Sequence, residues 1–226
     1  AYGRLVRYAQ DKGLIVIGDV KRADIGHSTT QYAHAQLSPV SAADLSEVAT
    51  PDAVTVNPYF GFDSIRPFVQ IARETGRGLF VLVQTSNESA GEIQGLALSD
   101  GAKVCERVGE IVQSWAKDDA LIGTHNYSCI GAVVSPRDLE STIRIRSMMP
   151  NCIFLVPGFG AQGRTADEVA KCFKSNGTGA FVNASRSVIY AYNDPQRRET
   201  CGDDWRQAVE TACKTLIHAV RQAVAP

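Results

Sequence analysis

Three things that the sequence lacks narrow the classes of protein it can belong to. No apolar run approaches the length that a membrane-spanning helix needs. The 23 basic and 24 acidic residues nearly cancel, leaving a formal net charge of −1. This balance argues against nucleic acid or a membrane surface as the main partner. No signal-peptide pattern opens the chain, and the sequence therefore predicts a cytoplasmic protein.

The cysteines and histidines lack the spacings of a disulfide framework or a metal site. No C-x-x-C pair occurs, and the four histidines show no metal-ligand spacing. We expect the cysteines to be reduced residues of the core and of helices. They are Cys105, Cys129, Cys152, Cys172, Cys201 and Cys213.

What the sequence does contain is an alternation of short apolar runs with stretches of helical periodicity. Continuous apolar runs are typical of parallel strands that are covered on both faces. We predict strands over residues 14–20, 53–58, 78–85, 130–135, 152–157 and 180–183. Apolar residues at helical spacing predict helices over residues 2–10, 64–75, 102–115 and 209–220. With 226 residues and 44% apolar content, the chain fits a single α/β domain over residues 1–226.

This alternation allows either a doubly wound open sheet or a (β/α)8 barrel. The G-x-G-x-x-G fingerprint of a nucleotide-binding doubly wound sheet is absent. Polar and charged residues instead follow several different strands, which favours the α/β class with TIM-barrel architecture. Six predicted strands are two fewer than the barrel has, so we expect the first two strands to be missing from the sequence as given.

The charged residues Asp19, Lys21 and Asp24 lie at the end of the first predicted strand or just after it. Asp19 and Lys21 are two residues apart, so on a regular strand their side chains point to the same face. Asp24 lies where the chain has left the strand and can fold back. Two carboxylates around one ammonium group are costly for a purely structural element but suit proton transfer. We therefore predict that all three are catalytic.

Two segments after the last two predicted strands suit a phosphate group. The loop from Pro157 to Gly163 holds three glycines, whose backbone can approach a ligand and turn N–H groups toward an anion. Arg186 follows the last strand, and its planar guanidinium can bind a phosphate through two hydrogen bonds. Loops in these positions hold phosphate in many barrels. The alternative interpretation is a turn followed by a surface arginine.

Two further strand ends carry hydrogen-bonding side chains. Residues 84–87 form a polar row that includes Thr85 and Ser86 and can contact the edge of a base. An ordinary helix cap explains the same row equally well. Ser28, Thr29 and Thr30 follow the charged motif. One of these hydroxyls can bond a sugar, and one is expected to cap the next helix.

Together these motifs resemble the orotidine 5'-phosphate decarboxylase family. The resemblance rests on D-x-K-x-x-D-I-G from Asp19, the pair Thr85-Ser86, P-G-F-G-A-Q-G from Pro157, and Arg186 after the last strand. Residues 52–59 are similar to the longer-chain bacterial branch. The family converts orotidine 5'-phosphate to uridine 5'-phosphate in de novo pyrimidine biosynthesis. The resemblance implies this carboxy-lyase activity, a cofactor-free and metal-free site, and a homodimer with shared active sites.

The resemblance also implies a role for each residue of the charged motif. Lys21 would donate the proton to C6 of the pyrimidine, and Asp19 would hold the charge of the lysine in place. Asp24 would lie near the substrate carboxylate, contributed across the dimer interface from the neighbouring subunit. Ile25 would line the pocket beside Asp24, and Ser28 would contact the ribose.

The remaining implied roles concern the base and the phosphate. Ser86 would bond the pyrimidine edge, and Arg186 would bind the phosphate. Gln162 would bridge base and phosphate on a closing loop, and Pro157 and Gly163 of the same loop would contact the substrate. A second lysine and a ribose-binding aspartate of the family are expected before Ala1.

Two other interpretations remain open from the sequence. One is a magnesium-dependent decarboxylase or aldolase of the same barrel superfamily that acts on a sugar phosphate. The other is a barrel that binds a phosphate ligand without catalysis. Loss of turnover in a chelator would favour the first.

Overall fold

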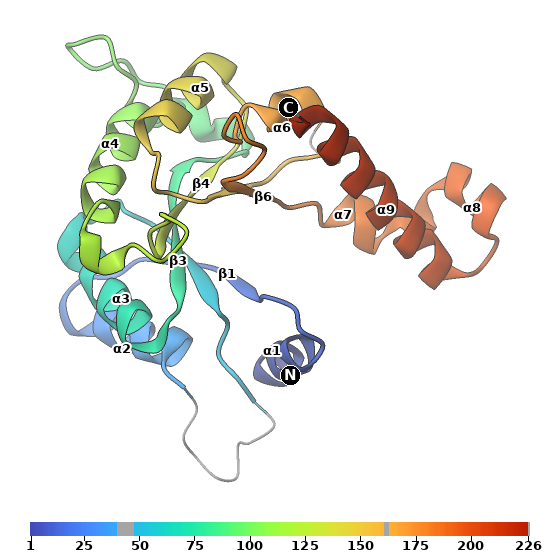
Figure 1. Ribbon diagram of the computed structural model, residues 1–226, viewed down its shortest axis with the longest axis horizontal. Helices are drawn as coiled ribbons and strands as arrows, with labels where there is room; N and C mark the ends of the chain where they lie inside the picture. The colour runs from blue at the N-terminus through green and yellow to red at the C-terminus, as the bar shows by residue number, and fades with distance from the viewer. Residues whose placement is uncertain (40–47, 161–162, 226) are drawn as a thin grey trace. The chain divides into compact units, whose positions relative to one another are not determined.

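The computed structural model describes residues 1–39, 48–160 and 163–225 (Figure 1). Strands and helices alternate along the chain. The strands are β1 (Ile17–Arg22), β2 (Ala53–Val56), β3 (Gly78–Gln84), β4 (Ile130–Val134), β5 (Phe154–Val156) and β6 (Ala180–Val182). The helices are α1 (Tyr2–Asp11), α2 (Gly26–Leu37), α3 (Phe62–Thr75), α4 (Val104–Ala116), α5 (Leu139–Met148), α6 (Ala166–Ala170), α7 (Arg186–Ile189), α8 (Pro195–Cys201) and α9 (Trp205–Val224).

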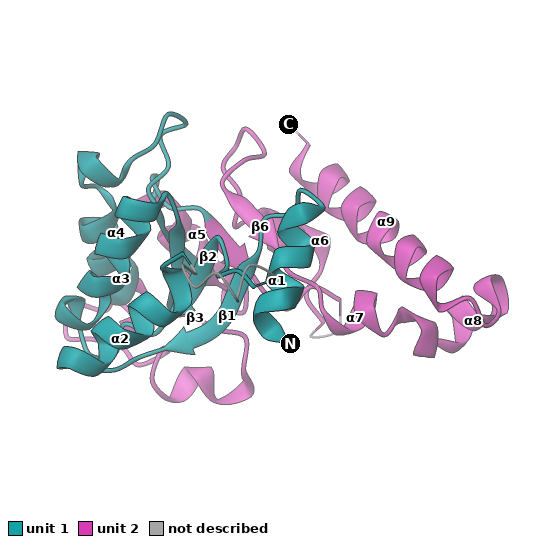
Figure 2. Cartoon of the chain, turned by 90° about the horizontal axis from the view of Figure 1, so that it is seen from below, with its two compact units in different colours: residues 1–83, 107–133, 149–153 teal, residues 84–106, 134–148, 154–226 magenta. Residues whose placement is uncertain are grey.

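The chain forms two compact units, which Figure 2 shows in different colours. Unit 1 comprises residues 1–83, 107–133 and 149–153, and unit 2 comprises residues 84–106, 134–148 and 154–226. The prediction of a single domain over residues 1–226 stays a prediction.

The order of the strands in the sheet is β1-β2-β3-β4-β5-β6, the same as their order along the chain. β1 pairs with β2 and β2 with β3 in parallel, and β5 pairs with β6 in parallel. In such a sheet the carboxyl ends of neighbouring strands meet at one edge, where barrels carry their active sites. The parallel α/β architecture predicted from the apolar runs is confirmed.

All six predicted strands are present among the described residues, but the first begins later than expected. The prediction started at Leu14, whereas β1 starts at Ile17. Leu14 and Ile15 are 61% and 72% exposed, so these two apolar side chains do not belong to a buried strand. They lie in the connection that follows α1, where hydrophobicity alone gave the wrong assignment.

The core of unit 1 lies between its strands and the helix α3. All four residues of β2 are buried, and so are Ile65, Phe68 and Ala72 on one side of α3. Gly131 of β4 is required by close packing, because a Cβ atom there would lie 2.6 Å from the Ile153 oxygen and 2.8 Å from the Phe80 ring. The helices predicted over residues 2–10, 64–75, 102–115 and 209–220 correspond to α1, α3, α4 and α9.

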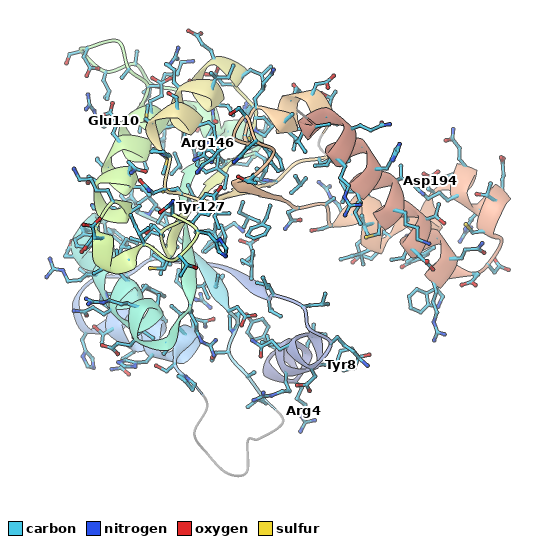
Figure 3. The ribbon with its side chains drawn as sticks, in the orientation of Figure 1. Arg4, Tyr8, Glu110, Tyr127, Arg146 and Asp194 are labelled. Atoms are coloured by element: carbon cyan, nitrogen blue, oxygen red, sulfur yellow. The ribbon has the colours of Figure 1, made fainter. Side chains whose placement is uncertain are left out.

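Unit 2 is organised around α9 and a buried arginine. α9 packs against α6, α7 and α8. Arg146 of α5, which is labelled in Figure 3, is only 8% exposed. Its guanidinium lies 3.8 Å from the centre of the Phe154 ring. The same guanidinium donates to the backbone oxygen of Gly179 at 3.2 Å. Arg146 therefore connects α5 to the first residue of β5 and to the residue that precedes β6.

All six cysteines are free, and three of them, Cys105, Cys152 and Cys172, are buried. Cys201 and Cys213 lie in α8 and α9, whereas Cys129 is half-buried in the bend before β4 and belongs to neither the core nor a helix. In the part of the chain that the structure describes, no helix is both long and apolar enough to cross a bilayer.

Candidate active site

Asp19 and Lys21 form an ion pair near the carboxyl end of β1. The Lys21 Nζ lies 2.5 Å from Asp19 Oδ2, and both side chains are about half exposed, at 52% and 55%. The structure thus brings together the first two members of the predicted catalytic set. An ammonium and a carboxylate at this edge of a parallel sheet are groups that can take part in proton transfer.

The pair forms on an irregular strand, which corrects the sequence-based geometry. Gly18 of β1 pairs with Val54 of β2, and the next paired positions are Arg22 and Val56. Three residues of β1, Asp19 to Lys21, therefore stand opposite the single residue Thr55. Lys21 has φ of 47°, a left-handed conformation that few residues other than glycine adopt. A β-bulge, and not the regular alternation of a strand, sets the direction of the Lys21 side chain.

Thr55 is a residue of this site that the sequence analysis missed. Its side chain is fully buried in β2, and its hydroxyl donates to Asp19 Oδ1 at 2.9 Å. The same Oγ1 accepts the backbone N–H of Lys21 at 2.9 Å. The signal available in the sequence was a lone hydroxyl inside the apolar run Ala53-Val54-Thr55-Val56.

The other predicted residues of unit 1 lie after β1 without joining the ion pair. Asp24 is half-buried, and its Oδ1 accepts the backbone N–H of Ile25 at 2.8 Å. Ile25 precedes the first turn of α2 and is 59% exposed. Ser28 is exposed on the first turn of α2. Within the described residues, no hydrogen bond links Asp24 or Ser28 to Lys21.

At the end of β3, in unit 2, Thr85 closes a polar turn. Its backbone N–H donates to Gln94 Oε1 at 2.8 Å, and its hydroxyl donates to Asn87 Oδ1 at 2.6 Å. The neighbouring Ser86 is half-buried and makes no side-chain hydrogen bond to any residue that the structure describes. Thr85 is thus engaged in the turn, while the Ser86 hydroxyl is left available to a ligand.

The glycine-rich loop and the segment after β6 lie together in unit 2. Gly158, Gly160 and Gly163 have φ of 98°, 71° and 77°, a region that favours glycine. A Cβ atom at Gly160 would lie 3.3 Å from the Ser187 hydroxyl, which places the loop beside the first turn of α7. Inside the loop the Gly163 N–H donates to the Gly160 oxygen at 2.8 Å. Gln162 lies outside the described residues.

Both ends of the predicted phosphate site have a defined local structure. Pro157 follows β5 directly and is half-buried. After Gly163, a capping box fixes the start of α6, in which the Thr165 hydroxyl accepts from the Glu168 N–H and the Glu168 carboxylate accepts from the Thr165 N–H. Arg186 begins α7, is exposed, and makes no hydrogen bond or ion pair through its side chain to any residue that the structure describes, so its guanidinium is open to an anion.

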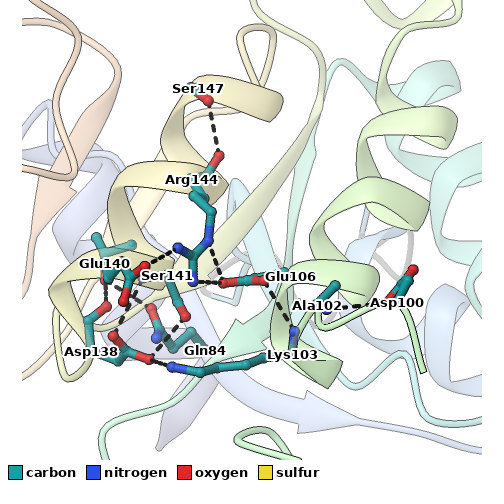
Figure 4. A network of polar contacts seen from close by, with 11 residues as sticks. Gln84, Asp100, Ala102, Lys103, Glu106, Asp138, Glu140, Ser141, Arg144 and Ser147 are labelled. Atoms are coloured by element: carbon teal, nitrogen blue, oxygen red, sulfur yellow. Dashed lines mark hydrogen bonds and ion pairs between the residues drawn. The ribbon is translucent and has the colours of Figure 1, made fainter. Parts of the chain in front are cut away.

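A second polar network in unit 2 joins the start of α4 to α5 (Figure 4). The Glu106 carboxylate is buried, which on its own would raise its pKa. Hydrogen bonds from the Lys103 N–H, Ser141 and Arg144 outweigh this effect and lower the pKa. The pKa of the Asp138 carboxyl is lowered in the same way. Burial raises this pKa, but the hydrogen bonds from Lys103 and Ser141 lower it by more. Sequence analysis singled out none of these residues. Their charged groups are paired with one another through hydrogen bonds and ion pairs, which is typical of a structural network.

The described residues contain no group of three or more His, Cys, Asp or Glu side chains that could hold a metal ion. The predicted site residues that the structure describes carry one ammonium group, two carboxylates, two hydroxyls and one guanidinium. These groups belong to Lys21, Asp19, Asp24, Ser28, Ser86 and Arg186. Such a set can transfer a proton and bind an anion.

Known proteins are similar to this chain over most of its length. A family model described as "Orotidine 5'-phosphate decarboxylase / HUMPS family" matches residues 1–199. The orotidine 5'-phosphate decarboxylase of Rhodopirellula baltica is 40% identical over 211 residues, which cover 93% of this chain and 68% of that protein.

Solved structures give the same result. A crystal structure from Streptomyces avermitilis aligns with a TM-score of 0.75 at 33% identity, over 99% of this chain and 70% of that one. The Leishmania donovani OMP decarboxylase aligns with a TM-score of 0.69 at 27% identity, over 97% of this chain and 74% of that one. These similarities confirm the predicted TIM-barrel class, of which the described residues contain six strands.

Proposed function

Because the chain belongs to the orotidine 5'-phosphate decarboxylase / HUMPS family, we propose that it decarboxylates orotidine 5'-phosphate to uridine 5'-phosphate, with Lys21 as the proton donor. The observation that carries this proposal is the Asp19–Lys21 ion pair at the end of β1, with Nζ 2.5 Å from the carboxylate. The similar Rhodopirellula protein bears the name of the same activity.

The chemistry requires an ammonium at the reacting carbon. The bond between C6 and the carboxylate breaks, carbon dioxide leaves, and the electron pair stays on C6. The Lys21 Nζ–H bond then breaks, its proton moves to C6, and the neutral amine regains a proton from water. A preorganised positive charge stabilises the developing carbanion in the transition state and is also the acid. Asp19 keeps that charge in place.

The remaining groups hold the substrate. We propose that Arg186 binds the phosphate, that the loop residue Gln162 bridges base and phosphate, that Pro157 and Gly163 contact the substrate, and that Ser86 bonds the pyrimidine. The open guanidinium of Arg186 and the available hydroxyl of Ser86 support these roles. Phosphate binding far from C6 supplies energy that positions the base for reaction.

We also propose that the protein acts as a homodimer in the cytoplasm. In this proposal Asp24 and Ile25 line the pocket of the neighbouring subunit, and Ser28 contacts the ribose. The exposure of the Ile25 side chain, at 59%, supports its use in such a shared site. The reaction is proposed to need no metal and no organic cofactor.

A substitution at Lys21 tests the proposal. In the full-length protein, Lys21→Ala removes the acid and the positive charge, so kcat for orotidine 5'-phosphate should fall by at least about 100-fold. Lys12→Ala is the matched control, since Lys12 is an exposed lysine at the end of α1 that lies 5.5 Å from the Tyr8 ring. The control should keep wild-type turnover.

Two results would contradict the proposal. One is turnover by Lys21→Ala that stays close to wild type. The other is loss of wild-type turnover in a chelator, which would indicate a metal-dependent reaction.

A further inference from the structure

Thr55 occupies a position that packing alone does not explain. The residues on either side of it in β2, Val54 and Val56, are fully buried apolar side chains, as is usual in a covered parallel strand. Valine has nearly the shape of threonine but no hydroxyl. A hydroxyl buried at 0% exposure is unfavourable unless it has hydrogen-bond partners. Its partners therefore indicate why it is there.

Those partners form a closed ring with the ion pair. The Lys21 backbone N–H donates to Thr55 Oγ1 at 2.9 Å, and the Thr55 hydroxyl donates to Asp19 Oδ1 at 2.9 Å. The other carboxylate oxygen, Oδ2, accepts from Lys21 Nζ at 2.5 Å. Both ends of Lys21, its backbone and its ammonium, are thus connected through one buried hydroxyl and one carboxylate.

The bulge makes this ring necessary. Because three residues of β1 face only Thr55, the regular ladder of backbone hydrogen bonds is interrupted between Gly18 and Arg22. Lys21 adopts φ of 47° at this point, a conformation that persists only where the surroundings hold it. The hydroxyl of Thr55 replaces the missing backbone partner of the Lys21 N–H.

Exposure shows which member of the ring is the fixed one. The side chains of Asp19 and Lys21 are 55% and 52% exposed, and an ion pair that is half exposed to water holds its geometry weakly on its own. Thr55 is fully buried, and its χ1 is restricted because it is β-branched. One carboxylate oxygen is therefore anchored to the core, while the other points at the ammonium.

We propose that Thr55 is a positioning residue that holds Asp19 and the bulge, and through them sets the place of the Lys21 ammonium. This inference rests on the proposed function, because it assigns Thr55 a part in the same proton transfer. Thr55 touches neither substrate nor reacting atoms in this proposal. It acts only through Asp19 and Lys21.

Thr55→Val and Thr55→Ser separate the hydroxyl from the shape of the side chain. Thr55→Val keeps the volume and removes both hydrogen bonds, so kcat for orotidine 5'-phosphate should fall by about 10- to 100-fold, as small misplacements of a reacting group do. KM should stay within about threefold, since the phosphate and base contacts are unchanged. Thr55→Ser keeps the hydroxyl and should restore kcat to within about threefold of wild type.

Thr142→Val is the matched control. Thr142 of α5 is also fully buried, and its hydroxyl lies 2.9 Å from Gln84 Oε1 and 2.8 Å from the backbone oxygen of Asp138. This variant loses a buried hydroxyl without touching the ring, and kcat per folded molecule should be unchanged. Circular dichroism and urea titration of each variant establish the folded fraction at the assay temperature.

A double variant tests whether Thr55 acts through Lys21. In a Lys21→Ala background there is no ammonium to position, so adding Thr55→Val should leave the residual rate unchanged. The proposal is overturned if Thr55→Val keeps wild-type kcat, if Thr55→Ser is as impaired as Thr55→Val, or if Thr55→Val lowers the rate equally in both backgrounds. Failure of the proposed function is distinct, because wild type would then not turn over orotidine 5'-phosphate or Lys21→Ala would remain active.

Discussion

The environment of a single side chain, that of Cys172, determines its reactivity. The side chain is fully buried in unit 2, with its Sγ 3.9 Å from the backbone oxygen of Val134. Burial raises the pKa of the thiol to about 12. At pH 8 about one molecule in ten thousand would then carry the reactive thiolate. We expect iodoacetamide to leave Cys172 unmodified in the folded protein.

Cys201 is the internal control for this alkylation experiment. It lies half-buried at the end of α8, where reagent can reach it. Mass spectrometry of peptides after alkylation should find Cys201 modified and Cys172 intact in the native protein, and both modified in urea. Equal rates of modification in the native protein would contradict the burial of Cys172.

Individual residues also show where prediction from sequence succeeded and where it failed. Asp19 and Lys21 were grouped from their residue types and spacing, and the structure joins them in an ion pair, while their catalytic role stays a prediction. Thr55 was missed because a threonine in a β-branched run is ordinary in composition. Only the pairing of β2 with β1 shows that Thr55 stands opposite the three residues of the bulge.

Within unit 2, Glu106 at the start of α4 forms an ion pair with Arg144 of α5. The Arg144 Nη2 atom lies 2.5 Å from Glu106 Oε1, and the glutamate side chain is only 5% exposed. Glu106→Ala should lower the free energy of unfolding by about 2 kcal/mol at pH 7, less than for a fully buried pair because Arg144 is partly exposed. Urea denaturation measures this difference.

The same variant gives a pH test with a defined sign. The pKa of Glu106 is lowered in the folded state, so its stabilising contribution is complete above the unfolded carboxyl pKa, about 4.3. It is lost as the pH falls through the lower folded-state value. The difference in stability between wild type and Glu106→Ala should therefore be largest near neutral pH and shrink progressively below about pH 4.

Glu110→Ala is the control for this element. Glu110 lies on the same helix, and its side chain, which is paired with Arg107, is 46% exposed. Such a pair should contribute less than about 0.5 kcal/mol. A loss of stability in Glu110→Ala as large as in Glu106→Ala would contradict the importance of burial.

The predicted elements were more reliable than their ends. Every predicted strand exists among the described residues. The apolar runs of β2, β4 and β5 are buried throughout, whereas β1 and β6 are only partly buried. The start of β1 was wrong because Leu14 and Ile15 are apolar but exposed, and periodicity cannot distinguish such residues from a strand. The bulge was not predicted, because it depends on how β1 pairs with β2 and not on the residues of β1 alone.

The proposed dimer can be tested by mixing two inactive subunits. If Asp24 serves the neighbouring subunit, a dimer of one Lys21→Ala chain and one Asp24→Asn chain has one site with both substitutions and one with neither. Random pairing by co-expression gives half hybrids, so about a quarter of wild-type activity should return. If Asp24 serves its own subunit, every site carries a substitution and the mixture stays inactive.

The hydrogen bond from the Lys21 amide to Thr55 has a consequence that needs no substrate. This amide is bonded to a side-chain hydroxyl at 2.9 Å and not to a carbonyl of the adjacent strand. Its hydrogen–deuterium exchange in the native protein therefore reports on that hydroxyl. The amide should be protected in wild type and in Thr55→Ser and should exchange faster in Thr55→Val. A backbone proton thus serves as a spectroscopic label for the arrangement of the Asp19–Lys21 pair.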